Sequence, residues 1–132
     1  YQLAVVVDDH EQRVTHIVRG ADLLDSTPRQ IHVQRLLGYA EPAYAHLPVA
    51  ADAQGEKLSK QTLAAPIDAE RPLAALCAAW GFLGQSWGNA IPGDVREFWP
   101  LAIKAWRLDR VPKRRSLPAP EYSSVYSPGY SR

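Results

Sequence analysis

The apolar pattern of this 132-residue chain changes at Pro66. Before Pro66, Leu3 to Val7 is a continuous apolar run rich in β-branched residues, which is typical of a buried strand in a parallel or doubly covered sheet. Val14 to Val18 is a second candidate strand. After Pro66, apolar residues between Arg71 and Leu83 recur at i, i+3, i+4, i+7 and i+10, which predicts a helix. The chain is therefore expected to combine an α/β region with a small helical region.

Local signals predict how these elements begin and end. His10 to Arg13 is expected to connect the two strands as a hairpin. Gly20 to Asp25 should form a short helix or turn. Ser26 or Thr27 can cap a following helix. Pro28 fits the first turn of that helix, and Gly38 fits the position after its last turn.

Proline and glycine also bound the segments that follow. Ala43 to Leu47 lies between Pro42 and Pro48 and cannot be a long helix. Asp52 to Gly55 has the composition of a turn. Gly84 is expected to end the helix that begins at Arg71.

The last predicted helix begins after Asp94, which can cap Val95 to Trp99. Pro100 is expected either to kink this helix or to start another, on which Trp99, Ile103 and Trp106 share a face. Four tryptophans lie within residues 80–106, and they are expected to form one small helical core.

Composition excludes several classes of protein. Apolar residues make up 46% of the chain and charged residues 22%, a balance typical of a globular domain. No apolar run approaches the roughly 20 residues of a membrane helix, and the first residues lack the features of a signal peptide. The chain has no methionine, so its start is expected to lie in the middle of a longer gene product. Its single cysteine, Cys77, excludes an intramolecular disulfide and favours a reducing, cytoplasmic location.

Charge is distributed unevenly along the chain. Residues 1–61 hold six basic and eight acidic residues, whereas residues 62–132 hold nine basic and six acidic ones. Six of those bases and one acid lie between Lys104 and Arg115. This basic run indicates either contact with phosphates or simply a solvated surface.

Few residues have the spacing of a catalytic or metal site. Asp8, Asp9 and His10 are adjacent, so on a strand they would point to opposite faces and could not converge on a metal. Lys57 and Lys60 follow a turn and can bring two ammonium groups onto one polyphosphate, although a solvated loop would look the same. Arg19 follows a predicted strand, at the sheet edge where α/β proteins bind ligands. It could hold a carboxylate in a bidentate manner or form a surface salt bridge.

Three stretches together resemble the class I glutamyl-tRNA synthetase family. They are Ala4 to His10 with Thr15 to Gln30, the phrase Ala45-His46-Leu47-Pro48, and the signature Lys57-Leu58-Ser59-Lys60-Gln61. The signature resembles the family's "KMSKS" loop, which closes over ATP. The stretches occur in the family's order, and the resemblance covers about residues 1–110.

The resemblance implies a glutamate pocket. Tyr1 would line this pocket, and Arg19 would bind the glutamate. Other glutamate contacts, the "HIGH"-type ATP motif and the zinc-ligand cysteines belong to an N-terminal half that is absent from this sequence. Zn²⁺ is therefore expected only in that missing half, and no metal is expected in this chain.

The resemblance also implies an ATP site. Lys57 and Lys60 would be catalytic, and Lys60 would contact ATP together with Ser59. His46 and Leu47 would lie near the adenine through their backbone. Mg²⁺ would accompany ATP as part of the substrate.

Two features point to a subgroup of the family. The signature ends in Gln61, where ordinary members usually have arginine, and the 71 residues after Gln61 are too few for a full anticodon-binding domain. Both features resemble truncated paralogues that activate glutamate with ATP and attach it to queuosine at the wobble position of tRNA(Asp). The implied partners are glutamate, ATP, tRNA(Asp) and the missing N-terminal half, with no membrane. The fragment alone is expected to be inactive.

The resemblance implies an α/β fold, with residues 1–61 as the second half of a Rossmann-type catalytic domain. Residues 62–117 would form the small helical domain, and residues 118–132 a tail rich in Tyr, Ser and Pro. Two alternatives stay open. The chain could be the C-terminal part of a discriminating glutamyl-tRNA synthetase, or a non-catalytic module that binds RNA or a partner.

Overall fold

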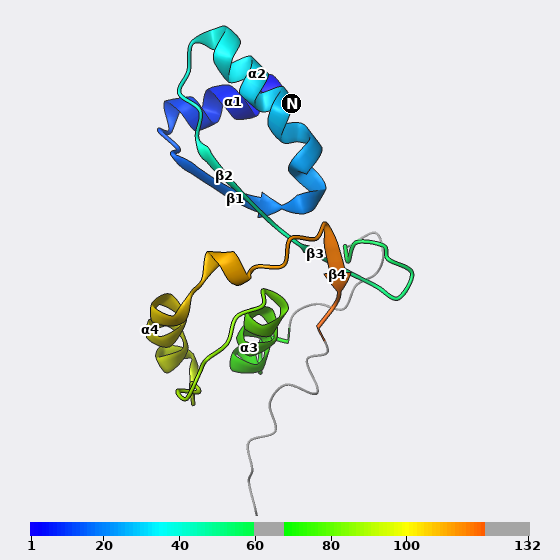
Figure 1. Ribbon diagram of the computed structural model, residues 1–132, viewed down its shortest axis with the longest axis vertical. Coiled ribbons are helices and arrows are strands. Elements are labelled where there is room, and N and C mark those ends of the chain that lie inside the picture. The colour runs from blue at the N-terminus through cyan, green and yellow to red at the C-terminus, as the bar shows by residue number, and fades with distance from the viewer. Residues whose placement is uncertain (60–67, 121–132) are drawn as a thin grey trace, which may run out of the picture.

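The computed structural model describes residues 1–59 and 68–120, which form an elongated α/β structure (Figure 1). Lys60, Gln61 and the tail from residue 121 onward lie outside the described residues. In chain order, the elements are α1 (Gln2–Glu11), β1 (His16–Gly20), η1 (Ala21–Ser26), α2 (Thr27–Leu37), β2 (Ala43–Leu47), β3 (Val49–Ala51), α3 (Pro72–Phe82), α4 (Val95–Ala105), η2 (Leu108–Arg110) and β4 (Ser116–Pro118).

Two parallel strand pairs organise the chain. β1 pairs with β2, so that Arg19 lies opposite His46 and Gly20 opposite Leu47. η1 and α2 supply the crossover that a parallel pair requires. β3 pairs with β4, which brings the segment after the last helix back to the first half of the chain (Figure 1). The parallel pairs with their helical connection confirm the α/β class.

The expected strand at Leu3 to Val7 is wrong, because these residues lie in α1, which packs beside α2 (Figure 1). A continuous apolar run has no period, so its pattern cannot separate a strand from a helix. The helix buries Val6 at 1% exposure and leaves Leu3 58% exposed. The expected hairpin is also wrong, since Arg13 adopts a left-handed φ of 57° just after α1 and β1 has a parallel partner. The second strand exists but begins two residues later than Val14 predicts, at His16.

The boundaries of α2 confirm most of the local prediction. Pro28 lies in the first turn, and Gly38 follows the helix with a left-handed φ of 69°. Gly20 to Asp25 is helical, as expected, within η1. The predicted cap is absent, because neither Ser26 nor Thr27 makes a capping hydrogen bond. The Thr27 hydroxyl instead contacts Arg19 and His46.

The helices α3 and α4 confirm the helical prediction for residues after Arg71. Gly84 follows α3 with a φ of 70°, and the Asp94 carboxylate accepts a hydrogen bond from the Glu97 amide, as expected of a cap. Pro100 lies inside α4 and does not start a new helix. Cys77 is buried in the core, and burial raises the pKa of its thiol.

The rings of the four tryptophans gather around Trp80 and Phe98, but they do not all lie in a buried core. Trp80 is buried and stacks on Trp87, with ring centroids 4.2 Å apart, and Phe98 meets both rings edge-on. Trp99 and Trp106 are 53% and 38% exposed, and they border an open apolar groove between α3 and α4. Helical spacing placed Trp99 and Trp106 near one face, but it could not show that nothing in the described chain covers that face.

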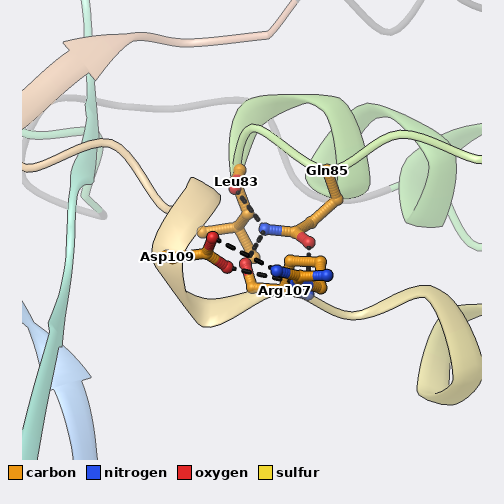
Figure 2. A network of polar contacts seen from close by, with 4 residues as sticks. All are labelled: Leu83, Gln85, Arg107 and Asp109. Carbon is orange, nitrogen blue, oxygen red and sulfur yellow. Dashed lines mark hydrogen bonds and ion pairs between the residues drawn. The ribbon is translucent and has the colours of Figure 1, made fainter.

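A buried glutamine fixes the connection after these helices (Figure 2). The Gln85 amide nitrogen donates to the carbonyl oxygens of Leu83 and Arg107, at 2.9 and 3.0 Å, and its oxygen accepts from the Arg107 amide at 2.9 Å. The Arg107 guanidinium pairs with Asp109. Gln85 therefore joins the end of α3 to the chain that leaves α4.

The domain boundaries expected at residues 61 and 117 stay predictions.

None of the helices within residues 1–59 and 68–120 has the length and the apolar character that spanning a membrane requires.

Candidate functional site

Arg19 is the centre of the candidate site and lies near the carboxyl end of β1. Its guanidinium donates to the Gln30 side-chain oxygen at 2.7 Å, to the Thr27 hydroxyl at 2.7 Å and to His46 Nε2 at 3.3 Å. It also lies over the Tyr44 ring, 5.2 Å from the centroid. These partners come from α2 and β2, so β1, β2 and their crossover helix together fix the orientation of Arg19.

All four partners of Arg19 are neutral. No carboxylate contacts this guanidinium within the described ranges 1–59 and 68–120. The three hydrogen bonds use three of its five N–H groups, and the other two can still donate. A half-buried, oriented guanidinium without an acidic partner can bind a carboxylate or a phosphate strongly.

His46 is held as a neutral ring. Its Nε2 accepts from Arg19 and lies 2.9 Å from the Thr27 hydroxyl, which leaves the ring proton on Nδ1. Burial, and then the positive charge of Arg19, lower the pKa of His46. His46, whose backbone is expected near the adenine, thus has its side chain in the Arg19 network, and Leu47 follows it, half-buried, at the end of β2.

Further side chains extend the network toward the start of the chain. The Gln30 amide donates to the Gln2 oxygen at 2.7 Å, and the Gln2 amide donates to the Ser26 hydroxyl at 3.2 Å. Tyr1 is 84% exposed and adjoins the network only as the neighbour of Gln2. The structure therefore brings Arg19 and His46 into contact and places Tyr1 beside their network, without contact to Arg19.

Sequence reasoning missed the polar side of α2. Thr27, Gln30 and Gln34 are buried at 9%, 2% and 3% exposure. They recur at i, i+3 and i+7, which is the spacing of one helix face. A polar stripe at helical spacing soon after Arg19 is the signal that would have identified these site residues.

The described part of the signature lies against η1. Lys57 Nζ contacts the Asp22 carboxylate at 2.5 Å, and the hydrogen bond from Lys57 lowers the pKa of Asp22. The Leu58 amide donates to the carbonyl of Ala50, and Ser59 is half-buried. Lys60 and Gln61 lie outside the described residues, so their expected roles stay predictions.

A turn before the signature sets the position of Lys57. The Asp52 carboxylate accepts from the amides of Gln54 and Glu56, both at 2.9 Å, and Gly55 has a φ of 85°. This confirms the predicted turn at Asp52 to Gly55.

Within residues 1–59 and 68–120, no group of three or more His, Cys, Asp or Glu side chains could hold a metal ion. The candidate site is instead built from one guanidinium, neutral hydrogen-bonding groups and the lysine of a loop. It lies at the carboxyl ends of two parallel strands, where open α/β sheets bind ligands. Such a site can orient an anionic substrate and stabilise developing phosphate charge.

Comparison with known families and structures identifies proteins that this chain resembles in sequence and in fold. Residues 1–75 match the family of tRNA synthetases class I (E and Q), catalytic domain. A solved glutamate tRNA ligase of Elizabethkingia meningosepticum, in complex with its amino acid, superposes with a TM-score of 0.62 at 25% sequence identity. That superposition covers 86% of this chain and 26% of the ligase.

Curated relatives are much more similar in sequence. Glutamyl-Q tRNA(Asp) synthetase of Aromatoleum aromaticum is 59% identical over 121 residues, which are 91% of this chain and 38% of the relative. The protein of the same name from Dechloromonas aromatica is 54% identical over 115 residues, 86% of this chain and 38% of the relative. The chain thus spans little more than a third of the length of these relatives.

Proposed function

This chain belongs to the family of class I tRNA synthetases for glutamate and glutamine, and we propose that it is one part of an enzyme that glutamylates queuosine in tRNA(Asp). The names of its relatives support this substrate, because proteins at 54–59% identity are called glutamyl-Q tRNA(Asp) synthetase. In this proposal, residues 1–61 are the second half of a Rossmann-type catalytic domain, residues 62–117 a small helical domain and residues 118–132 a tail.

The unpaired charge of Arg19 is the observation that supports the proposal most. Its described partners are neutral hydrogen-bond acceptors and an aromatic face, so the guanidinium is oriented without being neutralised. We assign it to a carboxylate of the bound glutamate, with Tyr1 at the edge of the same pocket. The neutral partners keep the full positive charge available for the ligand.

The reaction has two steps. A carboxylate oxygen of glutamate attacks the α-phosphate of ATP, so that the bond to pyrophosphate breaks and glutamyl-adenylate forms. A hydroxyl of the queuosine cyclopentene ring then attacks the glutamyl carbonyl, loses its proton and releases AMP. The enzyme orients these groups and stabilises phosphate charge, and no covalent enzyme intermediate is needed.

The signature loop supplies positive charge to the first step. Lys60, with Ser59, contacts ATP, and Lys57 assists as pyrophosphate leaves. The pair between Lys57 and Asp22 is more than half exposed on the lysine side. Exposed pairs of this kind contribute roughly 0–1 kcal/mol, so a phosphate can replace the Asp22 carboxylate at little cost.

We infer the remaining ligands and the location from the family. ATP binds with Mg²⁺, and its adenine lies against the backbone of His46 and Leu47. Zn²⁺ belongs to the part of the enzyme outside this sequence, which also completes the ATP and glutamate sites. We propose a cytoplasmic location, where tRNA(Asp) is available.

ATP–pyrophosphate exchange and glutamate transfer in the full-length protein test this function. We expect exchange that depends on glutamate, followed by transfer to tRNA(Asp) that contains queuosine but not to tRNA(Asp) that lacks it. Lys60→Ala should slow exchange about a hundredfold, the cost of losing one charge contact in the transition state, and leave glutamate binding nearly unchanged. Residues 1–132 alone should be inactive in exchange.

The alternatives give different results. Transfer of glutamate to the 3′ end of tRNA(Glu) would identify a discriminating glutamyl-tRNA synthetase. Absence of exchange in a folded, full-length protein would identify a non-catalytic module that binds RNA or a partner. Either result would overturn the proposed transfer to queuosine.

A further inference from the structure

A small hollow beside the Arg19 network is lined on one side by basic residues. It has a volume of about 260 Å³. Ala21 and Leu24 of η1 and His46 of β2 form one wall, and the opposite wall is the short basic segment Lys113, Arg114 and Arg115 just before β4. Ninety residues of sequence separate Asp25 in η1 from Arg115, so only the tertiary structure forms this hollow.

The segment is fixed in place by backbone and side-chain contacts. Arg115 holds the Asp25 carboxylate with both terminal nitrogens, each at 2.8 Å. Its carbonyl accepts from the Val49 amide at 3.0 Å, and the Arg114 amide donates to the Pro112 carbonyl at 2.9 Å. The basic side chains are therefore presented by an anchored segment, which reduces the entropy lost when a ligand binds.

The charge of the hollow is not neutralised. Asp25 compensates Arg115, and none of the described residues that line the hollow is acidic. Within residues 1–59 and 68–120, Lys113 and Arg114 form no salt bridge. Two positive charges thus remain, with the neutral His46 ring beside them.

The position and size of the hollow suggest which anion it binds. Its volume is below the roughly 300–1,000 Å³ of pockets for drug-sized ligands, so it fits one phosphate group with part of a sugar. His46 lines the hollow and also contacts Arg19, the proposed glutamate ligand. A phosphate held there would therefore lie next to the site at which the glutamyl group is transferred.

We propose that Lys113 and Arg114 form a site for a backbone phosphate of the RNA substrate and so place the acceptor nucleoside against the glutamate site. This inference rests on the proposed function for the identity of the RNA. It is narrower than the basic run of residues 104–115, because Arg115 and Arg107 are engaged by Asp25 and Asp109. Lys104 and Arg110 do not line the hollow. The contact positions the RNA without reading its sequence.

Direct measurement of RNA binding to the full-length protein tests the proposal. Lys113→Ala/Arg114→Ala should weaken binding of tRNA(Asp) roughly tenfold and flatten the salt dependence by about 0.7–0.9 units, the value for one phosphate contact. The loss should be equal for tRNA with and without queuosine. The KM for ATP in pyrophosphate exchange should change less than about twofold, because this phosphate belongs to RNA.

Two matched variants control for charge and folding. Arg96→Ala/Lys104→Ala removes the same charge from exposed positions on α4 and should leave the affinity within about twofold. Lys113→Arg/Arg114→Lys keeps the charge and should bind RNA nearly as the unaltered protein does. Thermal unfolding of each variant shows whether it is folded.

Three results would overturn the proposal. They are an unchanged affinity and salt slope in the Lys113/Arg114 variant, an equal loss in the α4 control, and a raised KM for ATP with unchanged RNA binding. The last result would assign the hollow to ATP. If the protein failed to activate glutamate but showed the expected RNA-binding pattern, the proposed function would fail and the phosphate site would stand.

Discussion

Two regions of this chain each bury a glutamine, and the partners of the two side chains differ. Gln30 joins the Arg19 guanidinium to Gln2, so all of its partners are side chains of the candidate site. Gln85 joins backbone groups of Leu83 and Arg107, next to a core of Trp80 and its aromatic neighbours.

This difference indicates that the buried residues around Arg19 serve ligand binding, whereas those between α3 and α4 serve stability. Around Arg19, the chain buries polar groups at sites where apolar side chains would give more hydrophobic stabilisation. Between α3 and α4, it buries aromatic rings, and the nearby Gln85 side chain hydrogen-bonds backbone groups. Substitutions in the first region should change ligand binding, whereas those in the second should change stability alone.

The largest effect on stability is expected from Trp80→Ala. Trp80 is 5% exposed, and its indole N–H has no hydrogen-bond partner within the described residues, so its contribution comes from packing. The free energy of unfolding should fall by about 3–5 kcal/mol. Urea unfolding measures this, with Trp99→Ala at the exposed groove as the control, expected to cost less than about 1 kcal/mol. Equal losses in the two variants would contradict the assigned core.

Among substitutions in the two compared regions, Arg19→Lys should give the largest effect on activity. Lysine keeps the charge but loses the planar fork that contacts Gln30, Thr27 and His46. A loss of about 2–3 kcal/mol corresponds to a rise of roughly 30- to 160-fold in the KM for glutamate, measured by pyrophosphate exchange. The KM for ATP should stay nearly constant. A rise confined to ATP would remove Arg19 from the glutamate site.

Gln30 and Gln85 provide a matched pair of substitutions that tests whether the two regions differ in function. Gln30→Leu and Gln85→Leu should each lower the free energy of unfolding by about 1–3 kcal/mol, because each leaves buried groups without partners. Only Gln30→Leu should also raise the KM for glutamate, since it releases the Arg19 guanidinium. If Gln85→Leu raised that KM equally, the two interiors would not be functionally distinct.

The smallest effect is expected from pH. The pKa of His46 is lowered from 6.5, so the folded protein favours the neutral ring. The stability that this ring contributes is fully present above pH 6.5 and is lost as the pH falls through the lowered pKa. His46→Gln should reduce this loss, as measured by thermal unfolding between pH 7 and pH 5. Carboxyl groups titrate mainly below this window, because their lowered pKa values start from 3.8 and 4.5. An unchanged pH profile in His46→Gln would contradict the assigned neutral ring.

Much of the local structure could be predicted from the sequence. Helices begin or end where the sequence predicts, at Pro28, Gly38, Gly84 and Asp94. Capping and left-handed turns depend on nearby residues, so they can be recognised in the sequence. The strand expected at Leu3 to Val7 failed, because a run of apolar residues without a period fits a helix equally well. Packing against α2 decided that case.

The sequence by itself determined the α/β class, the position of Arg19 at the end of a strand and the motifs that reveal the family. Only the tertiary structure decided what surrounds Arg19. Its partners Thr27, Gln30 and His46 come from two other elements, and the polar stripe of α2 places its residues on one helix face without showing that this face packs against Arg19. The structure also decided which bases stay unpaired, because the partner of Arg115 is Asp25, distant in sequence. Local signals depend on neighbours along the chain, whereas a binding site depends on groups that folding brings together from distant segments.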